Sequence, residues 1–150
     1  MLNIEIQYDT VLNAILNQLK KIYPDYKVYK NIISSPKYPN FFVNQIYAIP
    51  VPDTKNFWWL DYLFAIEYRQ SEDLKVAMNL EETLDEVAFN LNKNLWYLDE
   101  IKTWIKNPNT DKGEGVLSFT FNVRIRVRTE ELQALMQELT INYKENQMEV

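Results

Sequence analysis

Apolar and polar residues alternate most regularly between residues 116 and 128. A period of two predicts a β-strand with one face in the core and the other face outward. The outward set ends in Arg124, Arg126 and Arg128, which we expect to stand in a row about 6.5 Å apart. Residues 59–69 alternate in the same way and predict a second long strand. The apolar sets of the two strands are Leu117, Phe119, Phe121, Val123, Ile125 and Val127, and Leu60, Tyr62, Phe64, Ile66 and Tyr68.

Two stretches follow the helical period instead. Apolar residues spaced by three and four predict a helix over residues 11–22, which Asp9 or Thr10 can cap and Pro24 ends. A second apolar stripe predicts one long central helix over residues 71–93 with Ser71 as its N-cap. A shorter version of that helix begins at a capping box formed by Asn79 and Glu82.

The remaining segments predict shorter elements. We expect a short strand over residues 27–33, a central strand over residues 41–49 because both of its sides are apolar, and a strand over residues 95–106. The proline-containing residues 34–40 and 50–56 predict loops, and residues 107–115 predict a turn or mobile hairpin tip. Residues 130–150 predict a short helical turn or a direct extension into a strand, with a flexible tail from about residue 144.

This order of elements lacks the repeating βαβ pattern of a parallel sheet. We therefore predict a single α+β domain over residues 1–150, in which a mostly antiparallel sheet is flanked by the N-terminal helix and the long central helix. No internal repeat or linker divides the chain.

Composition narrows the chemistry. The chain of 150 residues contains no Cys and no His, so thiol and imidazole catalysis are excluded, and so is a disulfide framework. Its two glycines fall in one polar turn, so no phosphate-binding loop is present. The first residues lack the pattern of a signal peptide and no apolar run could span a bilayer, so we expect a soluble chain kept in a cytoplasm.

Carboxylates provide the remaining candidates for chemistry. Glu81, Glu82, Asp85 and Glu86 form an acidic cluster early in the central helix, where acids favour the helix dipole, and we interpret it as a solvated face rather than a metal site. Asp61 and Glu67 share a strand face with Arg69 and are expected to form cross-strand ion pairs, because a paired-carboxylate site would need a cleft and a partner. We predict no catalytic residue, cofactor or metal.

The arginine row is open to three interpretations. It can be solvated surface, paired across the sheet with Asp61 or Glu67. It can form a strip against a neighbouring subunit, because Arg is enriched at interfaces. A groove for nucleic acid is the third, and the tryptophans could then stack bases. The net charge of -5 argues against a nucleic-acid partner.

Two motifs resemble a known family. "KYPNFFVNQI", which contains Pro39–Phe42, is similar to an early strand of the tail terminator proteins of phages and prophages of low-GC Gram-positive bacteria. "LMQELTINYKE", which contains Leu135–Asn142, resembles the C-terminal segment of the same family. The order of the other elements fits as well. Family members often have Pro before the second motif; here the residue is Ala134, which favours a helical entry.

The resemblance implies a structural, non-enzymatic protein. Tail terminators are small α/β domains that form a ring, commonly a hexamer, which caps the tail tube, ends its polymerisation and provides the surface for docking to the head connector. The implied partners are further copies of the chain, the tail tube protein and the head–tail connector protein, with no membrane. The implied location is the virion tail, assembled in the host cytoplasm. The alternative function is a nucleic-acid-binding accessory module that uses the arginine face.

A closed ring needs two different, complementary patches on each subunit. The candidates on the arginine side are Arg124, Arg126 and Arg128, together with Trp59, Asp61 and Glu67 on the neighbouring strand. The candidates on the acidic helix are Glu82 and Glu86.

Overall fold

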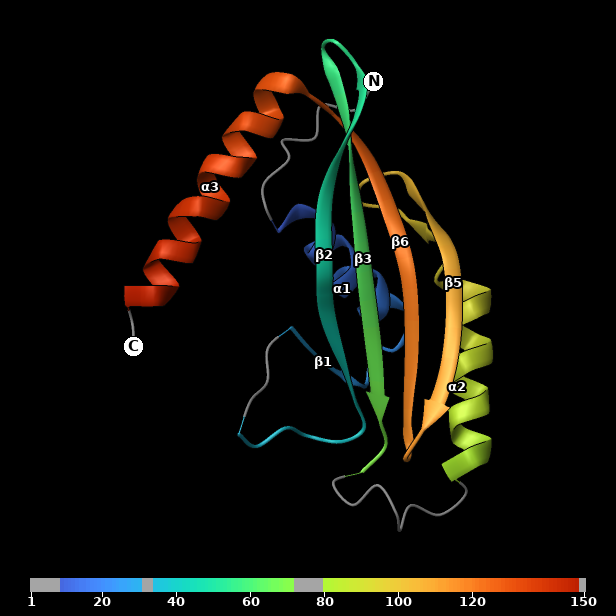
Figure 1. Ribbon diagram of the computed structural model, residues 1–150. Helices are drawn as coiled ribbons and strands as arrows, with labels where there is room; N and C mark the ends of the chain where they lie inside the picture. The colour runs from blue at the N-terminus through green and yellow to red at the C-terminus, as the bar shows by residue number, and fades with distance from the viewer. Residues whose placement is uncertain (1–8, 31–33, 72–79, 149–150) are drawn as a thin grey trace.

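The computed structural model (Figure 1) describes residues 9–30, 34–71 and 80–148, with the backbone alone from residue 139 onward. The described elements are α1 (Thr10–Ile22), β1 (Lys27–Tyr29), β2 (Asn40–Thr54), β3 (Phe57–Arg69), α2 (Leu80–Asn94), β4 (Tyr97–Leu98), β5 (Thr103–Gly113), β6 (Val116–Arg128) and α3 (Thr129–Met148). The strands form one sheet in the order β1-β2-β3-β6-β5-β4, in which only β1 and β2 run parallel. The predicted α+β class with a mostly antiparallel sheet is confirmed.

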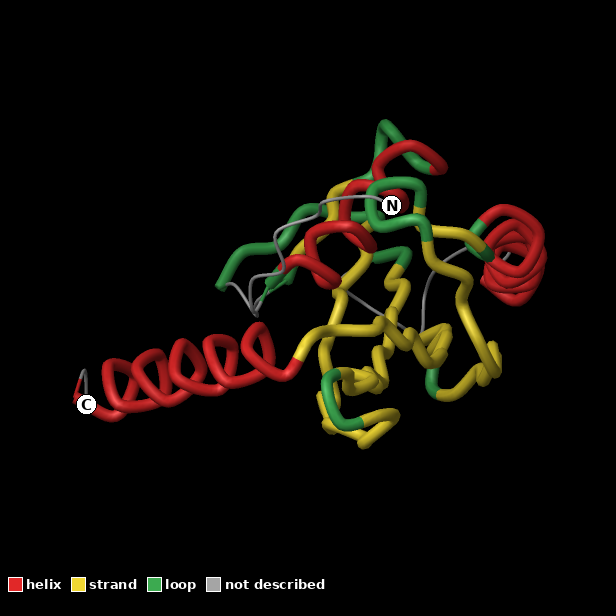
Figure 2. Tube along the Cα trace, turned by 90° about the horizontal axis from the view of Figure 1, so that it is seen from above, coloured by secondary structure: helices red, strands yellow, loops and turns green. Residues whose placement is uncertain are grey.

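The two strands with the strictest alternation, β3 and β6, lie side by side at the centre of the sheet. Their predicted core residues are all buried. Helices α1 and α2 place Val11, Ile15, Leu84 and Leu91 in the same core and so cover one face of the sheet. The opposite face of β2, β3 and β6 carries no described helix (Figures 1 and 2). We call this uncovered side the outer face.

Strand β2 is longer than the sequence predicted, and the expected loop over residues 50–56 is wrong for residues 50–54, which belong to the strand. Residues Pro50 and Pro52 lie within the strand, opposite Leu60 and Trp58 of β3. Strand β1 pairs only with Asn40–Phe42, so the rest of β2 is a sheet edge among the described residues. Proline is tolerated at an edge because its missing N–H interrupts no ladder there. The prediction of a central strand therefore holds only for the first residues of β2.

The segment around α2 and β5 differs from the prediction in three ways. The described helix α2 has 15 residues and is shorter than α3, so a single long central helix is not supported; residues 72–79 of the longer version lie outside the described residues. The strand predicted over residues 95–106 is divided by a turn, where Lys102 has a φ of 52°. Residues Asn107–Gly113 belong to β5, so only Glu114 and Gly115, with φ of 53° and 79°, form the hairpin tip.

The C-terminal segment is helical throughout Thr129–Met148, so the predicted extension into a strand is wrong. Its start is held by the β2–β3 hairpin: the Thr129 N–H donates to the Asn56 carbonyl at 3.0 Å, and the Thr129 hydroxyl to the Lys55 carbonyl at 3.3 Å. Leu132 and Leu135 are buried in the core. Beyond them the helix projects from the body of the molecule (Figures 1 and 2). Residues 144–148, expected to be a flexible tail, belong to this helix.

Burial of Tyr62 on β3 predicts a loss of stability at high pH. Burial raises the pKa of Tyr62 to about 12 from its ordinary value of 10.0. Because the folded-state pKa is the higher one, the stabilisation is complete below pH 10 and is lost as the pH rises from 10 to 12. The loss amounts to about 3 kcal/mol. Tyr68, whose pKa burial also raises, adds to it.

The variant Tyr62→Phe is expected to match the unmodified protein at pH 7 and to lose less stability between pH 10 and 12, because it has one phenol fewer to ionise. Urea unfolding at a series of pH values measures this difference. Parallel curves for the two proteins across that range would contradict the assignment.

Candidate interaction surface

The register of β3 and β6 places the predicted arginine row on the outer face. Arg124 lies opposite Asp61, Arg126 opposite Trp59, and Arg128 opposite Phe57. The two faces predicted for β6 therefore hold: its apolar residues point into the core and the arginines away from it. The structure brings Arg124, Arg126, Trp59 and Asp61 together as a cluster at one end of the outer face.

Two of the arginines have acidic and aromatic neighbours. Arg124 lies 4.0 Å from the Asp61 carboxylate, and its guanidinium is 5.6 Å from the Trp59 ring centroid. Arg126 Nε donates to Asp53 Oδ2 at 2.9 Å, and its guanidinium lies 4.1 Å from the Phe57 ring centroid. The pairing of Arg124 with Asp61 agrees with the interpretation as solvated, cross-strand surface. Half-exposed pairs of this kind contribute only about 0.2–1 kcal/mol, so they leave the arginines open to a partner.

Arg128 differs from the other two arginines. Its side chain is exposed, and it forms no ion pair with any described residue. Asp53 and Phe57 were missed in the sequence, because Asp53 falls in the segment expected to be a loop. No simple alternation could have placed Asp53, because it falls at the register shift between Pro52 and Thr54.

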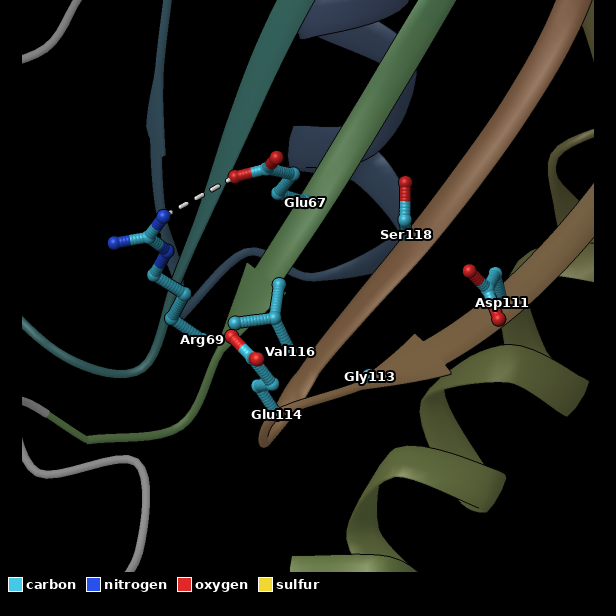
Figure 3. A pocket seen from close by; sticks show the side chains of 7 residues that line it. All are labelled: Glu67, Arg69, Asp111, Gly113, Glu114, Val116 and Ser118. Carbon is cyan, nitrogen blue, oxygen red and sulfur yellow. Dashed lines mark hydrogen bonds and ion pairs between the residues drawn. The ribbon is translucent and has the colours of Figure 1, made fainter.

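Glu67 lies away from the arginine row. It pairs with Arg69 on its own strand at 3.3 Å, about 20 Å along β3 from Asp61. There the outer face has a pocket of about 320 Å³ with three carboxylates and one arginine (Figure 3). Its lining residues are Glu67, Arg69, Asp111, Gly113, Glu114, Val116 and Ser118. The outer face is thus basic at one end and acidic at the other.

No cluster of acidic residues in the described part of the chain is arranged to hold a metal ion.

The acidic residues of α2 have two different roles. Glu81 and Asp85 accept hydrogen bonds from Lys112 of β5 at 3.3 and 2.5 Å, and these bonds raise the pKa of Lys112. Glu82 and Glu86 are exposed and form no ion pair with the described residues. They are four residues apart and so share one side of the helix. This side belongs to the helical layer, not to the outer face, so the subunit's own arginines do not meet it (Figure 2).

Phe89 follows Glu86 by three residues and is 71% exposed. It therefore adds a large apolar side chain to the same side of α2 as Glu82 and Glu86. The sequence pattern missed Phe89, because it lies outside the apolar stripe of the helix. A large apolar residue outside the buried stripe of a helix is the sequence signal that could have indicated an interaction site.

Aromatic residues also gather where β4 meets β5. The ring centroid of Trp104 lies 4.9 Å from that of Trp96 and 5.4 Å from that of Tyr97. Trp96 is 48% and Trp104 59% exposed. Exposed rings in contact with one another are typical of interaction sites. The sequence did not show this cluster, because it forms through the pairing of Tyr97 with Trp104 across a turn that the pattern did not predict.

A family model described as phage tail terminator protein matches residues 10–134. No curated protein matches the chain. Within the described residues, no helix is both long and apolar enough to cross a membrane.

Proposed function

Because the chain belongs to the phage tail terminator family, we propose that it forms a ring which caps the tail tube, ends polymerisation of the tube and offers a docking surface to the head connector. Family membership makes it a structural protein of the phage tail that interacts with other tail components and with head-connector components. The expected ring contains six copies, and the expected location is the tail of the virion, assembled in the host cytoplasm.

The uncovered outer face is the observation that supports a subunit interface most directly. A sheet usually buries both faces when its outward residues are substantially apolar, and here Ile49, opposite Asp61, is exposed on the same face as half-buried Trp59 and Leu63. Arginines next to aromatic rings, as at Arg124 with Trp59, are the composition of interface hot spots.

The acidic side of α2 provides a complementary patch. In a ring, each copy presents one patch to the copy before it and a different patch to the copy after it. We assign Arg124, Arg126 and Arg128, with Trp59 and Asp61, to one side of the contact, and Glu67 to the far edge of the same side, about 20 Å from Asp61 along β3. Glu82 and Glu86 form the other side, together with Phe89, which lies on the same side of α2. Opposite charges on two separate faces of one subunit favour head-to-tail association over closed pairs.

Assembly on tail tubes tests this function. The purified chain is incubated with tail tubes of the phage or prophage that encodes it, and the products are examined by light scattering and negative-stain imaging. We expect a ring at one end of each tube and no further growth when tube protein is added. A chain that remains monomeric and leaves tube growth unchanged at all concentrations contradicts the proposal.

Nucleic-acid binding receives no specific support from the structure. Arg124 and Arg126 lie beside the carboxylates of Asp61 and Asp53, which repel phosphate. Retardation of DNA or RNA at low salt, falling steeply toward physiological salt, would favour that alternative over a purely structural role.

A further inference from the structure

The two sides of the sheet differ in how they are protected against pairing with another chain. Sheet edges are commonly blocked by charged side chains, prolines, bulges or a covering helix. Strand β5 has such devices: it contains Lys106, Asp111 and Lys112, and its register shifts after Lys106. Helix α2 lies along β5 (Figure 1), and Lys112 pairs with acidic residues of that helix.

Strand β2, on the other side, has little of this protection. The segment Asn40–Pro52 contains no Asp, Glu, Lys or Arg. Ile46 and Ile49 are 50% and 46% exposed. Beyond the short pairing of β1 with Asn40–Phe42, no other described strand adjoins β2 on that side. An apolar, uncharged edge of this kind is typical of a strand that binds an extended peptide by β-augmentation.

The prolines of β2 show which of its backbone groups face the open side. Alternate residues of an antiparallel strand direct their N–H and C=O groups to opposite sides. Pro50 and Pro52 lie in the ladder with β3, so their missing N–H groups belong on the open side. Ala48 shares their alternation and therefore directs its N–H to the same side.

The bulge of β2 changes this alternation by one residue. The register with β3 shifts between Gln45 and Tyr47, and Ile46 is the extra residue. On the far side of the bulge, Val43 and Gln45 therefore direct their N–H and C=O groups to the open edge. Together with Ala48, they provide the donors and acceptors that a further strand would need.

These backbone groups lie in a slot with two defined ends. Strand β1 closes one end at Phe42, and Pro50 closes the other because it has no N–H to donate. The open residues are Val43–Ile49, which extend over roughly 23 Å. We call Val43–Ile49 the β2 slot.

The slot suits a segment of another protein better than a second copy of this chain. If two slots paired about a two-fold axis, Pro50–Pro52 of one copy would fall opposite Asn40–Phe42 of the other, where β1 already lies. Every described strand of the chain is also paired within its own sheet, so none is free to enter the slot of a neighbour.

We propose that the β2 slot binds an extended, uncharged segment of the tail tube protein, which adds a strand beside β2. Its backbone bonds with Val43, Gln45 and Ala48, and apolar side chains of the segment cover Ile46 and Ile49. A charged segment is disfavoured, because Asn40–Pro52 offers no counter-charge. The inference rests on the proposed capping of the tail tube and names the contact that would hold the tube.

Hydrogen exchange tests this docking, because an added strand protects amides that are free in the subunit. The chain is exchanged alone and after assembly on tail tubes of the phage or prophage that encodes it. Peptides covering residues 43–49 are then compared by mass spectrometry. We expect the amides of Val43, Gln45 and Ala48 to exchange rapidly in the isolated chain and about a hundredfold more slowly on the tubes.

The other outcomes of the exchange experiment separate this inference from the proposed function. Slow exchange of the three amides in the isolated chain would mean that the chain fills its own slot, which would overturn the inference. Rings on the tubes with unchanged exchange would overturn the docking alone. A chain that does not bind the tubes would overturn the docking and the proposed function together. Protection without a ring would support the docking and contradict the ring.

A photo-cross-linker identifies the occupant of the slot. The chain contains no native cysteine, so an Ile46→Cys variant accepts a single benzophenone maleimide. On tail tubes, we expect the main adduct to join the chain to the tube protein. A main adduct between two copies of the chain would show that a second copy occupies the slot and would overturn the inference.

Two variants give a readout of affinity. Ala48→Pro removes one donor from the slot and is expected to weaken binding to the tubes about tenfold, the effect of one lost hydrogen bond. Ile46→Lys places a charge on the exposed edge and should weaken binding as well. Gln133→Lys on α3 is the matched control, because Gln133 is also exposed. Circular dichroism checks that each variant folds, and equal binding by Ile46→Lys and Gln133→Lys would refute the docking.

Discussion

Replacing Phe64 with alanine is expected to destabilise the isolated subunit by about 3–5 kcal/mol, the largest effect on stability that we predict. Phe64 is completely buried on β3, with its ring centroid 5.7 Å from that of Tyr62 and 5.9 Å from that of Phe121 on β6. Truncation removes these contacts and leaves a cavity between the two central strands β3 and β6, whose paired backbones cannot move together to fill it. Urea unfolding followed by tryptophan fluorescence measures the loss.

The neighbouring residue supplies the control for Phe64→Ala. Leu63 is next to Phe64 on the same strand, but its side chain lies on the outer face and is only half-buried. Leu63→Ala is therefore expected to cost clearly less than Phe64→Ala in the isolated subunit. Equal losses of stability for the two variants would mean that the outer face is covered even in the monomer. The outer face would then not be free to form an interface.

Reversal of the arginine row is expected to abolish ring assembly while leaving a folded subunit. In the Arg124→Glu/Arg126→Glu/Arg128→Glu variant, new carboxylates stand beside Asp61 and Asp53. Like charges across a sheet cost about 0.2–1 kcal/mol per pair, which is small against the 5–15 kcal/mol stability of ordinary domains. The same reversal places acidic groups against the acidic side of α2 in a neighbouring copy. Circular dichroism checks the fold, and imaging of tails checks the ring.

Two further variants separate the arginines' roles. Asp53→Arg combined with Arg126→Glu restores an ion pair of inverted polarity within the subunit, so any remaining assembly defect belongs to the contact between subunits. Arg128→Glu alone disturbs no ion pair of the described residues and should still weaken assembly. Normal tail length and normal joining to heads in the triple variant would identify the row as plain solvated surface.

The sequence predicted those elements whose own period decides their structure. Strands β3 and β6 and helix α1 lie within two residues of their predicted bounds, because each buries a continuous apolar face that only one register can satisfy. The placement of Arg124 opposite Asp61 is foreseeable for the same reason, since both residues belong to the outward sets of strictly alternating strands.

The elements that were missed depend on tertiary neighbours. Pro50 and Pro52 normally indicate a loop, but they are compatible with a strand at a sheet edge, and no local pattern shows which edge stays open. Likewise, the helical start of α3 depends on hydrogen bonds from Thr129 to the distant β2–β3 hairpin. The ion pair of Asp53 with Arg126 was missed for the same reason, because Asp53 lies in the part of β2 that was expected to be a loop.

The pairing of β3 with β6 has a consequence for how the chain folds. Phe57 pairs with Arg128 and Arg69 with Val116, so the central ladder joins segments from the two halves of the chain. Sheets built from such distant segments form slowly, because the entropy cost of closing a long loop comes before the favourable contacts form. Until β6 is inserted, the β2–β3 hairpin has an unpaired edge on β3, which is a template for aggregation. We therefore expect this subunit to refold with a slow phase. During that phase, we expect the extent of aggregation to rise with protein concentration.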